Sequence, residues 1–181
     1  MEQRTGADAA GVPAEAEQAA RAALAVLRRR SASLAVAESL TGGLIGAAVT
    51  AVPGASESFR GGIISYATEL KAGLLGVDAA LLARSGAVHP EVAVAMARGV
   101  RDRLAADFGL AVTGVAGPDP QDGRPVGTVF VGLAGPGGVT RMNGLDIVGD
   151  RAGIRAQTVV RALRFLHSAV DSYPNRGEQL R

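Results

Sequence analysis

Cysteine is absent from this chain, and histidine and aromatic residues are scarce. Without cysteine there can be no disulfide, no thiolate-ligated zinc and no cysteine nucleophile. The two histidines do not indicate a ligand set, because His89 directly precedes Pro90 at an expected helix start and His167 lies late in an amphipathic helix. We therefore expect no metal site, and neither a cysteine nucleophile nor a histidine base.

Charge is nearly balanced, since 19 basic and 17 acidic residues give a net charge of +2, and aromatic residues make up only 3% of the chain. Nucleic-acid binding is favoured by a strongly basic surface and by rings that stack on bases, so we expect no nucleic-acid partner. The N-terminus lacks the residue order of a signal peptide, and no apolar run reaches the roughly 18 residues that a membrane span needs. These features predict a cytoplasmic protein that does not associate with membranes.

Apolar strand-like runs alternate with helical runs in one domain, which is expected to span residues 15–172. Residues 1–14 are expected to form a disordered tail, and residues 173–181 a frayed one. The predicted helices are 15–30, 44–52, 68–75, 77–82, 90–108 and 150–172. The predicted strands are 34–37, 61–66 (buried), 110–116, and the hairpin 127–134 and 140–148. This order predicts an α/β fold, a three-layer α/β/α sandwich around a mixed β-sheet.

The turn after the first predicted strand carries Ser39, followed by Thr41, Gly42 and Gly43 at the start of a predicted helix. Backbone N–H groups at a helix start have no partner within the helix and point outward. Such a turn suits a nucleophile or a bound anion. The alternative is that Ser39 or Thr41 only caps the helix.

Lys71 is the only lysine in the chain, and it lies among leucines in a predicted short helix. Partial burial there would lower its pKa toward the neutral amine that a general base requires. Tyr66 precedes it by five residues and could face the same crevice. The alternative is an ordinary surface lysine. The spacing is one residue too long for the Tyr-x-x-x-Lys pair of short-chain dehydrogenases, and the chain has neither a dinucleotide-binding glycine motif nor a P-loop motif.

Arg151 and Arg155 lie on the opening turns of the last predicted helix, where two cations oppose the helix dipole and each other. An anion must offset that cost. Asp146 and Asp150 could supply it within the chain. A bound phosphate is the other possibility, because arginine binds phosphate in bidentate geometry.

Five motifs in order resemble the CinA C-terminal domain family, over about residues 15–169. They are Ala37-Glu38-Ser39-x-Thr41-Gly42-Gly43, Gly62-x-x-x-Tyr66-x-x-x-x-Lys71, Thr113-Gly114-Val115-Ala116-Gly117-Pro118, Pro125-Val126-Gly127-Thr128-Val129 and Gly149-Asp150-Arg151. That family includes bacterial amidases that hydrolyse the carboxamide of nicotinamide mononucleotide to nicotinate mononucleotide and ammonia, in pyridine-nucleotide salvage. The resemblance implies that fold, a small-molecule nucleotide substrate, no metal or redox cofactor, and a homo-oligomer.

The same resemblance implies that Ser39 is the nucleophile, Lys71 the general base and Tyr66 its assistant, with Thr113 and Arg151 also at the site. We then expect backbone N–H groups of residues 41–43 to hold the oxyanion, and Arg151 or Arg155 to anchor the 5′-phosphate. Two alternatives stay open: a nucleotide-binding regulatory module without catalysis, and an amidase for another small amide. Two departures from the family pattern are Leu40, where cysteine is common, and the loop 119–123, where glycines are common.

Overall fold

The computed structural model describes residues 12–173, so residues 1–11 and 174–181 of the two expected tails lie outside the described part. Its helices are α1 (Ala14–Arg29), α2 (Leu44–Thr50), α3 (Thr68–Leu75), α4 (Ala79–Ser85), α5 (Pro90–Arg103) and α6 (Arg151–Asp171). Its strands are β1 (Leu34–Glu38), β2 (Phe59–Ile64), β3 (Phe108–Gly114), β4 (Thr128–Ala134) and β5 (Thr140–Asp146).

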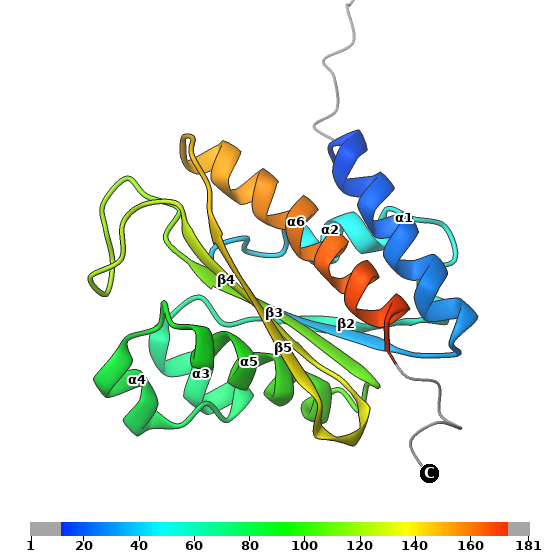
Figure 1. Ribbon diagram of the computed structural model, residues 1–181, viewed down its shortest axis with the longest axis horizontal. Coiled ribbons are helices and arrows are strands. Elements are labelled where there is room, and N and C mark those ends of the chain that lie inside the picture. Colours follow the sequence, from blue (N-terminus) through cyan, green and yellow to red (C-terminus); the bar gives the residue numbers. More distant parts are fainter. Residues whose placement is uncertain (1–11, 174–181) are drawn as a thin grey trace, which may run out of the picture.

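The strands form one five-stranded sheet in the order β2-β1-β3-β4-β5. β1 pairs in parallel with β2 and β3, whereas β4 and β5 continue the sheet as an antiparallel hairpin. Figure 1 shows α1, α2 and α6 covering one face of this sheet and α3, α4 and α5 covering the other. The predicted three-layer α/β/α sandwich around a mixed sheet is therefore confirmed.

The central strand β1 is buried along its whole length and divides the core between the two faces. Successive side chains of a strand point to opposite faces. Leu34 and Val36 accordingly belong to the apolar cluster under α1, α2 and α6, and Ala35 and Ala37 to the cluster under α3, α4 and α5. Both faces of β1 are therefore closed to solvent, and only the end of the strand at Ser39 can present a side chain to a ligand.

Helix α5 approaches the sheet closely on the second face. A Cβ atom at Gly109 of β3 would lie 2.0 Å from the carbonyl oxygen of Ala97 in α5, so only glycine fits at this position. The contact packs α5 tightly on the sheet at this point. Open α/β sheets usually bind ligands at the carboxyl ends of their parallel strands, and Ser39 follows β1 at that end.

Beyond shifts of up to three residues in the bounds of other elements, three predictions differ from the structure. The helix from Pro90 ends at Arg103 and not at residue 108, because Ala105 adopts a positive φ of 49° and the Ala106 N–H closes back on the Arg101 carbonyl. The strand predicted as buried over 61–66 is the edge strand β2, with alternating exposure along it. Tyr173, assigned to the frayed tail, is buried and packs edge-to-face on Phe108.

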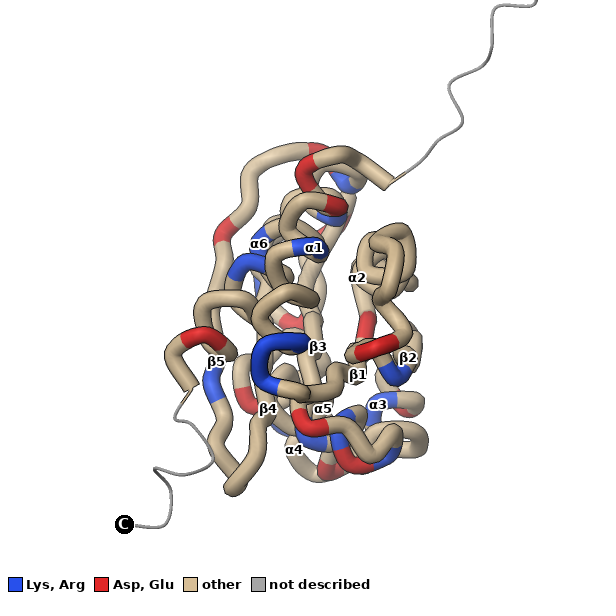
Figure 2. Tube along the Cα trace, turned by 90° about the vertical axis from the view of Figure 1, so that its right-hand side faces the viewer, with Lys and Arg blue, Asp and Glu red and all other residues tan. Residues whose placement is uncertain are grey.

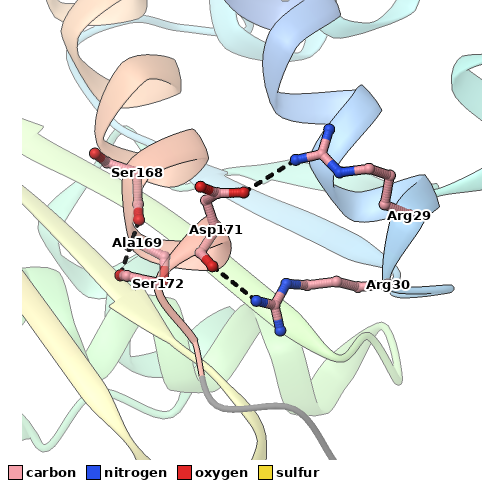
Figure 3. Close-up of polar contacts among 6 residues, drawn as sticks. All are labelled: Arg29, Arg30, Ser168, Ala169, Asp171 and Ser172. Atoms are coloured by element: carbon pink, nitrogen blue, oxygen red, sulfur yellow. Dashed lines mark hydrogen bonds and ion pairs between the residues drawn. The ribbon is translucent and has the colours of Figure 1, made fainter.

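Charged residues of both signs are spread along the chain, as the coloured trace in Figure 2 shows. The Arg28–Arg30 run at the end of α1 lies beside the end of α6. Arg29 forms an ion pair of 3.0 Å with the Asp171 carboxylate, and Arg30 donates to the Asp171 carbonyl at 2.7 Å (Figure 3). These arginines join the two helices, since they bind the partly unpaired C-terminal end of α6.

Among residues 12–173, no helix combines the length and apolar character required to cross a bilayer.

Candidate functional site

Ser39 is the first residue after β1 and lies at the carboxyl end of the parallel strands. Its N–H donates to the Val112 carbonyl of β3 at 3.2 Å, which continues the sheet ladder by one residue and fixes the position of the serine backbone. The side chain borders a cavity of about 240 Å³. Ser39 therefore sits on a rigid strand end and still faces a space that a small ligand can enter.

Lys71 reaches Ser39 from helix α3. Its Nζ donates to the Ser39 Oγ at 3.2 Å and to the carbonyl oxygens of Ser65 and Tyr66 at 2.8 and 3.2 Å. The residue is only 1% exposed, so the alternative of a surface lysine is wrong. Burial lowers the pKa of Lys71 to about 8, although the negative charges of Asp122 and Glu69 act in the opposite direction. This shift increases the fraction of Lys71 that is the neutral amine near physiological pH.

Glu38, which the sequence did not single out, organises the turn after Ser39. Its buried carboxylate accepts the N–H groups of Gly43 and Ile45 at 3.0 Å each, and that of Gly46 at 2.8 Å. This places a negative charge at the N-terminus of α2, which stabilises the helix dipole. Glu38 and not Ser39 or Thr41 binds the first N–H groups of α2, and the Thr41 hydroxyl has no hydrogen-bond partner among the described residues. The alternative in which Ser39 or Thr41 serves as a simple cap is therefore wrong. An acidic residue just before a helix-opening turn was the available sequence signal.

The predicted oxyanion donors need correction for Gly42 and Gly43. The Gly43 N–H is bound by Glu38, and the Gly42 N–H donates to the Ser39 carbonyl at 3.1 Å, so neither can bind a substrate oxygen. Within the described residues, the N–H groups of Leu40 and Thr41 have no acceptor. Leu40 also lines the cavity. The donors in this turn without an acceptor are thus those of the two residues directly after Ser39, and of these only Leu40 lines the cavity.

Arg155 does not face the cavity. Its Nε donates to the Leu40 carbonyl at 3.0 Å and its Nη2 to the Thr41 carbonyl at 2.9 Å. Arg155 lies one helical turn after Arg151, and its side chain points at the serine turn and not into the cavity. Arg155 therefore orients the Leu40–Thr41 peptide unit, which carries the Thr41 N–H, and the Thr41–Gly42 peptide unit that follows it.

Arg151 does line the cavity, together with Tyr66. Its guanidinium donates to the Tyr66 hydroxyl at 3.0 Å and to the Gly117 carbonyl at 2.6 Å. Asp150 instead caps α6 by accepting the Gly153 N–H at 2.7 Å. Within residues 12–173 Arg151 forms no ion pair with a carboxylate, so its charge is available to an anionic ligand. Tyr66 is 59% exposed, and its carbonyl oxygen, not its hydroxyl, contacts Lys71.

Thr113, at the end of β3, is buried, and its hydroxyl donates to the Ala87 carbonyl at 2.8 Å. Thr113 therefore lines the cavity and holds Ala87, another lining residue, through this hydrogen bond.

Asp119 also lines the cavity and, among the described residues, has no hydrogen-bonding or ionic partner. The cavity is lined by Ser39, Leu40, Tyr66, Ala67, Thr68, Ala87, Val88, Thr113, Gly114, Val115, Ala116, Gly117, Asp119, Gln121 and Arg151.

A larger cavity of about 490 Å³ lies among α1, α2 and α6, but it contains none of the groups described above and is mostly apolar. In the described part of the chain, no three His, Cys, Asp or Glu side chains gather as metal ligands would. The cavity beside Ser39 is therefore the site where the Ser39 hydroxyl, the Lys71 amine bound to it and the Arg151 guanidinium come together.

Residues 16–170 match the model of the CinA C-terminal domain. The chain belongs to the CinA C-terminal domain family. Every residue of the site described above lies inside the matched range. The family resemblance expected from the five sequence motifs is therefore confirmed.

Relatives of this CinA-family chain are longer proteins. A CinA-like protein of Frankia casuarinae is 58% identical over 153 residues, which cover 84% of this chain and 35% of the relative. A CinA-like protein of Myxococcus xanthus is 45% identical over 175 residues, covering 95% of this chain and 41% of that protein. The chain thus spans little more than a third of the length of these relatives.

Solved structures with the CinA fold align over their whole length. A competence/damage inducible protein from Agrobacterium tumefaciens has a TM-score of 0.83 and 33% identity, covering 88% of this chain and 98% of that chain. A CinA superfamily protein from Klebsiella pneumoniae has a TM-score of 0.84 and 28% identity, covering 87% of this chain and 99% of that chain. These solved chains therefore consist almost entirely of a domain with this topology.

Proposed function

We propose that this CinA-family domain hydrolyses the carboxamide of nicotinamide mononucleotide, giving nicotinate mononucleotide and ammonia in pyridine-nucleotide salvage. The single observation that carries the proposal is the contact of 3.2 Å between Lys71 Nζ and Ser39 Oγ, with Lys71 buried and its pKa lowered to about 8. A buried amine beside a hydroxyl is the arrangement that activates a serine without histidine.

In the first half of the reaction, neutral Lys71 takes the proton of the Ser39 hydroxyl as Oγ bonds to the carboxamide carbon. The carbonyl oxygen becomes an oxyanion, which the N–H groups of Leu40 and Thr41 stabilise; one such donor contributes about 3 kcal/mol. The C–N bond then breaks, and the leaving amine takes the proton from Lys71 to depart as ammonia. An ester on Ser39 remains.

In the second half, water attacks the ester carbon while Lys71 takes one of its protons. The ester C–O bond breaks, the acid product leaves, and Lys71 returns the proton to Ser39 Oγ. Because Lys71 contacts Ser39 directly and Tyr66 meets it only through a carbonyl oxygen, the proton moves without the tyrosine hydroxyl. Tyr66 instead orients Arg151 through their hydrogen bond.

The charges around the cavity support a nucleotide with a cationic ring. Two N–H groups of Arg151 are used within the protein, which leaves three of the five guanidinium donors for a phosphate. Asp119 supplies an unpartnered carboxylate on the same cavity. Nicotinamide mononucleotide carries a positive pyridinium ring and an anionic phosphate, so it matches one negative and one positive group.

Ammonia release from nicotinamide mononucleotide tests the proposal, with the riboside and several uncharged amides as comparison substrates. Turnover in the parent should fall by about a thousandfold or more in Ser39→Ala and by about 10²–10⁴ in Lys71→Met. Binding of the mononucleotide without turnover in the parent would favour the regulatory module. Faster turnover of an uncharged amide would assign a different amide substrate to the same site.

A further inference from the structure

A tight turn in the loop after β3 presents one carboxylate to the cavity wall. Gln121 and Arg124 exchange backbone hydrogen bonds of 3.1 and 2.8 Å, and the two residues between them, Asp122 and Gly123, have positive φ angles of 52° and 69°. Positive φ at both central residues is what a type I′ turn requires, and Asp-Gly is a preferred sequence for it. The Arg124 guanidinium lies 5.8 Å from the centre of the Phe130 ring, which fixes the turn against β4.

The Asp122 carboxylate binds the segment between α4 and α5. Its Oδ2 accepts the Ala87 N–H at 2.6 Å and the Val88 N–H at 3.1 Å. The preceding Gly86 has a φ of +71°, and a Cβ atom there would lie 2.4 Å from the Asp122 Cγ. The glycine therefore allows the two loops to meet, and the carboxylate joins them.

Ala87 is held at both of its backbone polar groups. Asp122 binds its N–H, and the Thr113 hydroxyl binds its carbonyl oxygen. Ala87 and Val88 are buried, and both line the cavity that Ser39 borders. The position of this wall relative to the serine is consequently set by two side chains from separate segments.

We propose that Asp122 is a positioning residue, which clamps the Ala87–Val88 wall so that the substrate amide is held against Ser39. The proposal rests on the amidase function proposed above and adds a residue to it. Asp122 itself makes no contact with the reacting atoms. Its contribution is to hold the wall in place before the substrate arrives, which reduces the ordering cost of binding.

Kinetics of two substitutions separate the clamp from a general effect on folding. Asp122→Asn keeps an acceptor oxygen for the two N–H groups, whereas Asp122→Ala removes it. We expect kcat/KM to fall by about tenfold or more in Asp122→Ala, mainly through KM, and by less than about threefold in Asp122→Asn. Asp146→Ala, an exposed aspartate at the end of β5, is the matched control and should leave both constants unchanged.

The comparison must be made at the pH plateau of each variant, because the Asp122 charge also raises the pKa of Lys71, as Glu69 does from α3. Unchanged kinetics in Asp122→Ala would overturn the proposal. Equal impairment of Asp122→Asn and Asp122→Ala would overturn it as well, because the acceptor oxygen would then not be the property that matters.

Amide hydrogen exchange measured by NMR tests the clamp without any substrate. The Ala87 and Val88 amide protons should exchange about tenfold or more faster in Asp122→Ala than in the parent, and near the parental rate in Asp122→Asn. Equal exchange in all three proteins would overturn the clamp. If the parent hydrolyses no amide, the proposed function fails, and these exchange rates alone still support or overturn the clamp.

Discussion

Lys71 Nζ and Ser39 Oγ lie 3.2 Å apart although 32 residues separate them in the chain. The parallel pairing of β1 with β2 brings them together, because Ser39 follows one strand and the segment that leads to α3 follows its neighbour. The Ser65 and Tyr66 carbonyl oxygens, at the end of β2, direct the lysine toward the serine. The pairing of two neighbouring strands thus aligns the amine with the hydroxyl.

The pH dependence of turnover should report the ionisation of Lys71. Only the neutral amine can accept the Ser39 proton, and the pKa of Lys71 is lowered to about 8. We expect kcat/KM to rise with pH and to level off above about pH 8. Steady-state ammonia release between about pH 6 and 10 measures the curve. A rate that does not change over this range would contradict a role for Lys71 as the base.

Stability should depend on pH for the same reason. The pKa of Lys71 is about 8 in the folded chain and about 10.5 when unfolded, so between these values the unfolded state binds the extra proton. The free energy of unfolding should therefore rise with pH across this window, by up to about 3 kcal/mol. Below pH 8 both states are protonated, and the folded state carries the full cost of a buried charge.

Urea denaturation of the parent and of Lys71→Met at several pH values measures this effect. The methionine keeps the apolar volume and removes the proton site, so the difference between the two proteins isolates Lys71 from other groups. The parent should gain stability relative to Lys71→Met as pH increases from about 8 to 10. A constant difference would show that Lys71 has the same proton affinity in both states.

The two arginines of α6 should differ in their kinetic effects. Arg151→Ala should raise KM for the mononucleotide by about tenfold or more, with a much smaller effect on the riboside, because its free donors face the cavity. Arg155→Ala should instead lower kcat for both substrates by a similar factor, because it releases the Leu40 and Thr41 carbonyls.

Arg161→Ala is a suitable control on the same helix, since Arg161 is exposed and contacts Gln157. It should change neither constant. Equal losses on the two substrates in Arg151→Ala would refute the phosphate assignment. A selective loss on the mononucleotide in Arg155→Ala would restore that residue as a phosphate ligand in the bound state.

Removal of Glu38 should destabilise the fold and slow turnover. In Glu38→Ala, the N–H groups of Gly43, Ile45 and Gly46 lose their acceptor, at a cost of about 3 kcal/mol or more in the free energy of unfolding. Glu57→Ala, at an exposed carboxylate with only a distant ion pair of 3.9 Å, should change stability by less than about 0.5 kcal/mol. Similar unfolding midpoints for the two variants would rule out the capping role.

The elements that could be predicted from sequence have strong local patterns. Three features depend only on neighbouring residues: the apolar run of β1, the Pro90 start of α5 and the periodicity of α6. The first of them placed Ser39 correctly at the end of a strand. The end of α5 was missed because Ala105 adopts a positive φ that its residue type does not favour. The edge position of β2 was missed because it depends on pairing, which apolar content alone does not reveal.

Lys71 could be predicted as a site residue because it is the only lysine in the chain, and Ser39 because it lies in a recognisable turn between a strand and a helix. The site was not predictable where a side chain binds backbone groups far away in the chain. Arg155 and Asp122 act on carbonyl and N–H groups 114 and 35 residues away, respectively, and no residue type marks such an acceptor or donor in the sequence. The polar partners of a backbone group become visible only when the loops are in place.

The single lysine has a spectroscopic consequence. Its ε-amine is the only side-chain amine in the chain, and it lies within hydrogen-bond distance of Ser39. Labelling with isotopic lysine would therefore give one side-chain signal, free of overlap, that arises inside the site. Ligand entry, acylation of the serine and changes in ionisation could each be followed at that one resonance without introducing a foreign probe.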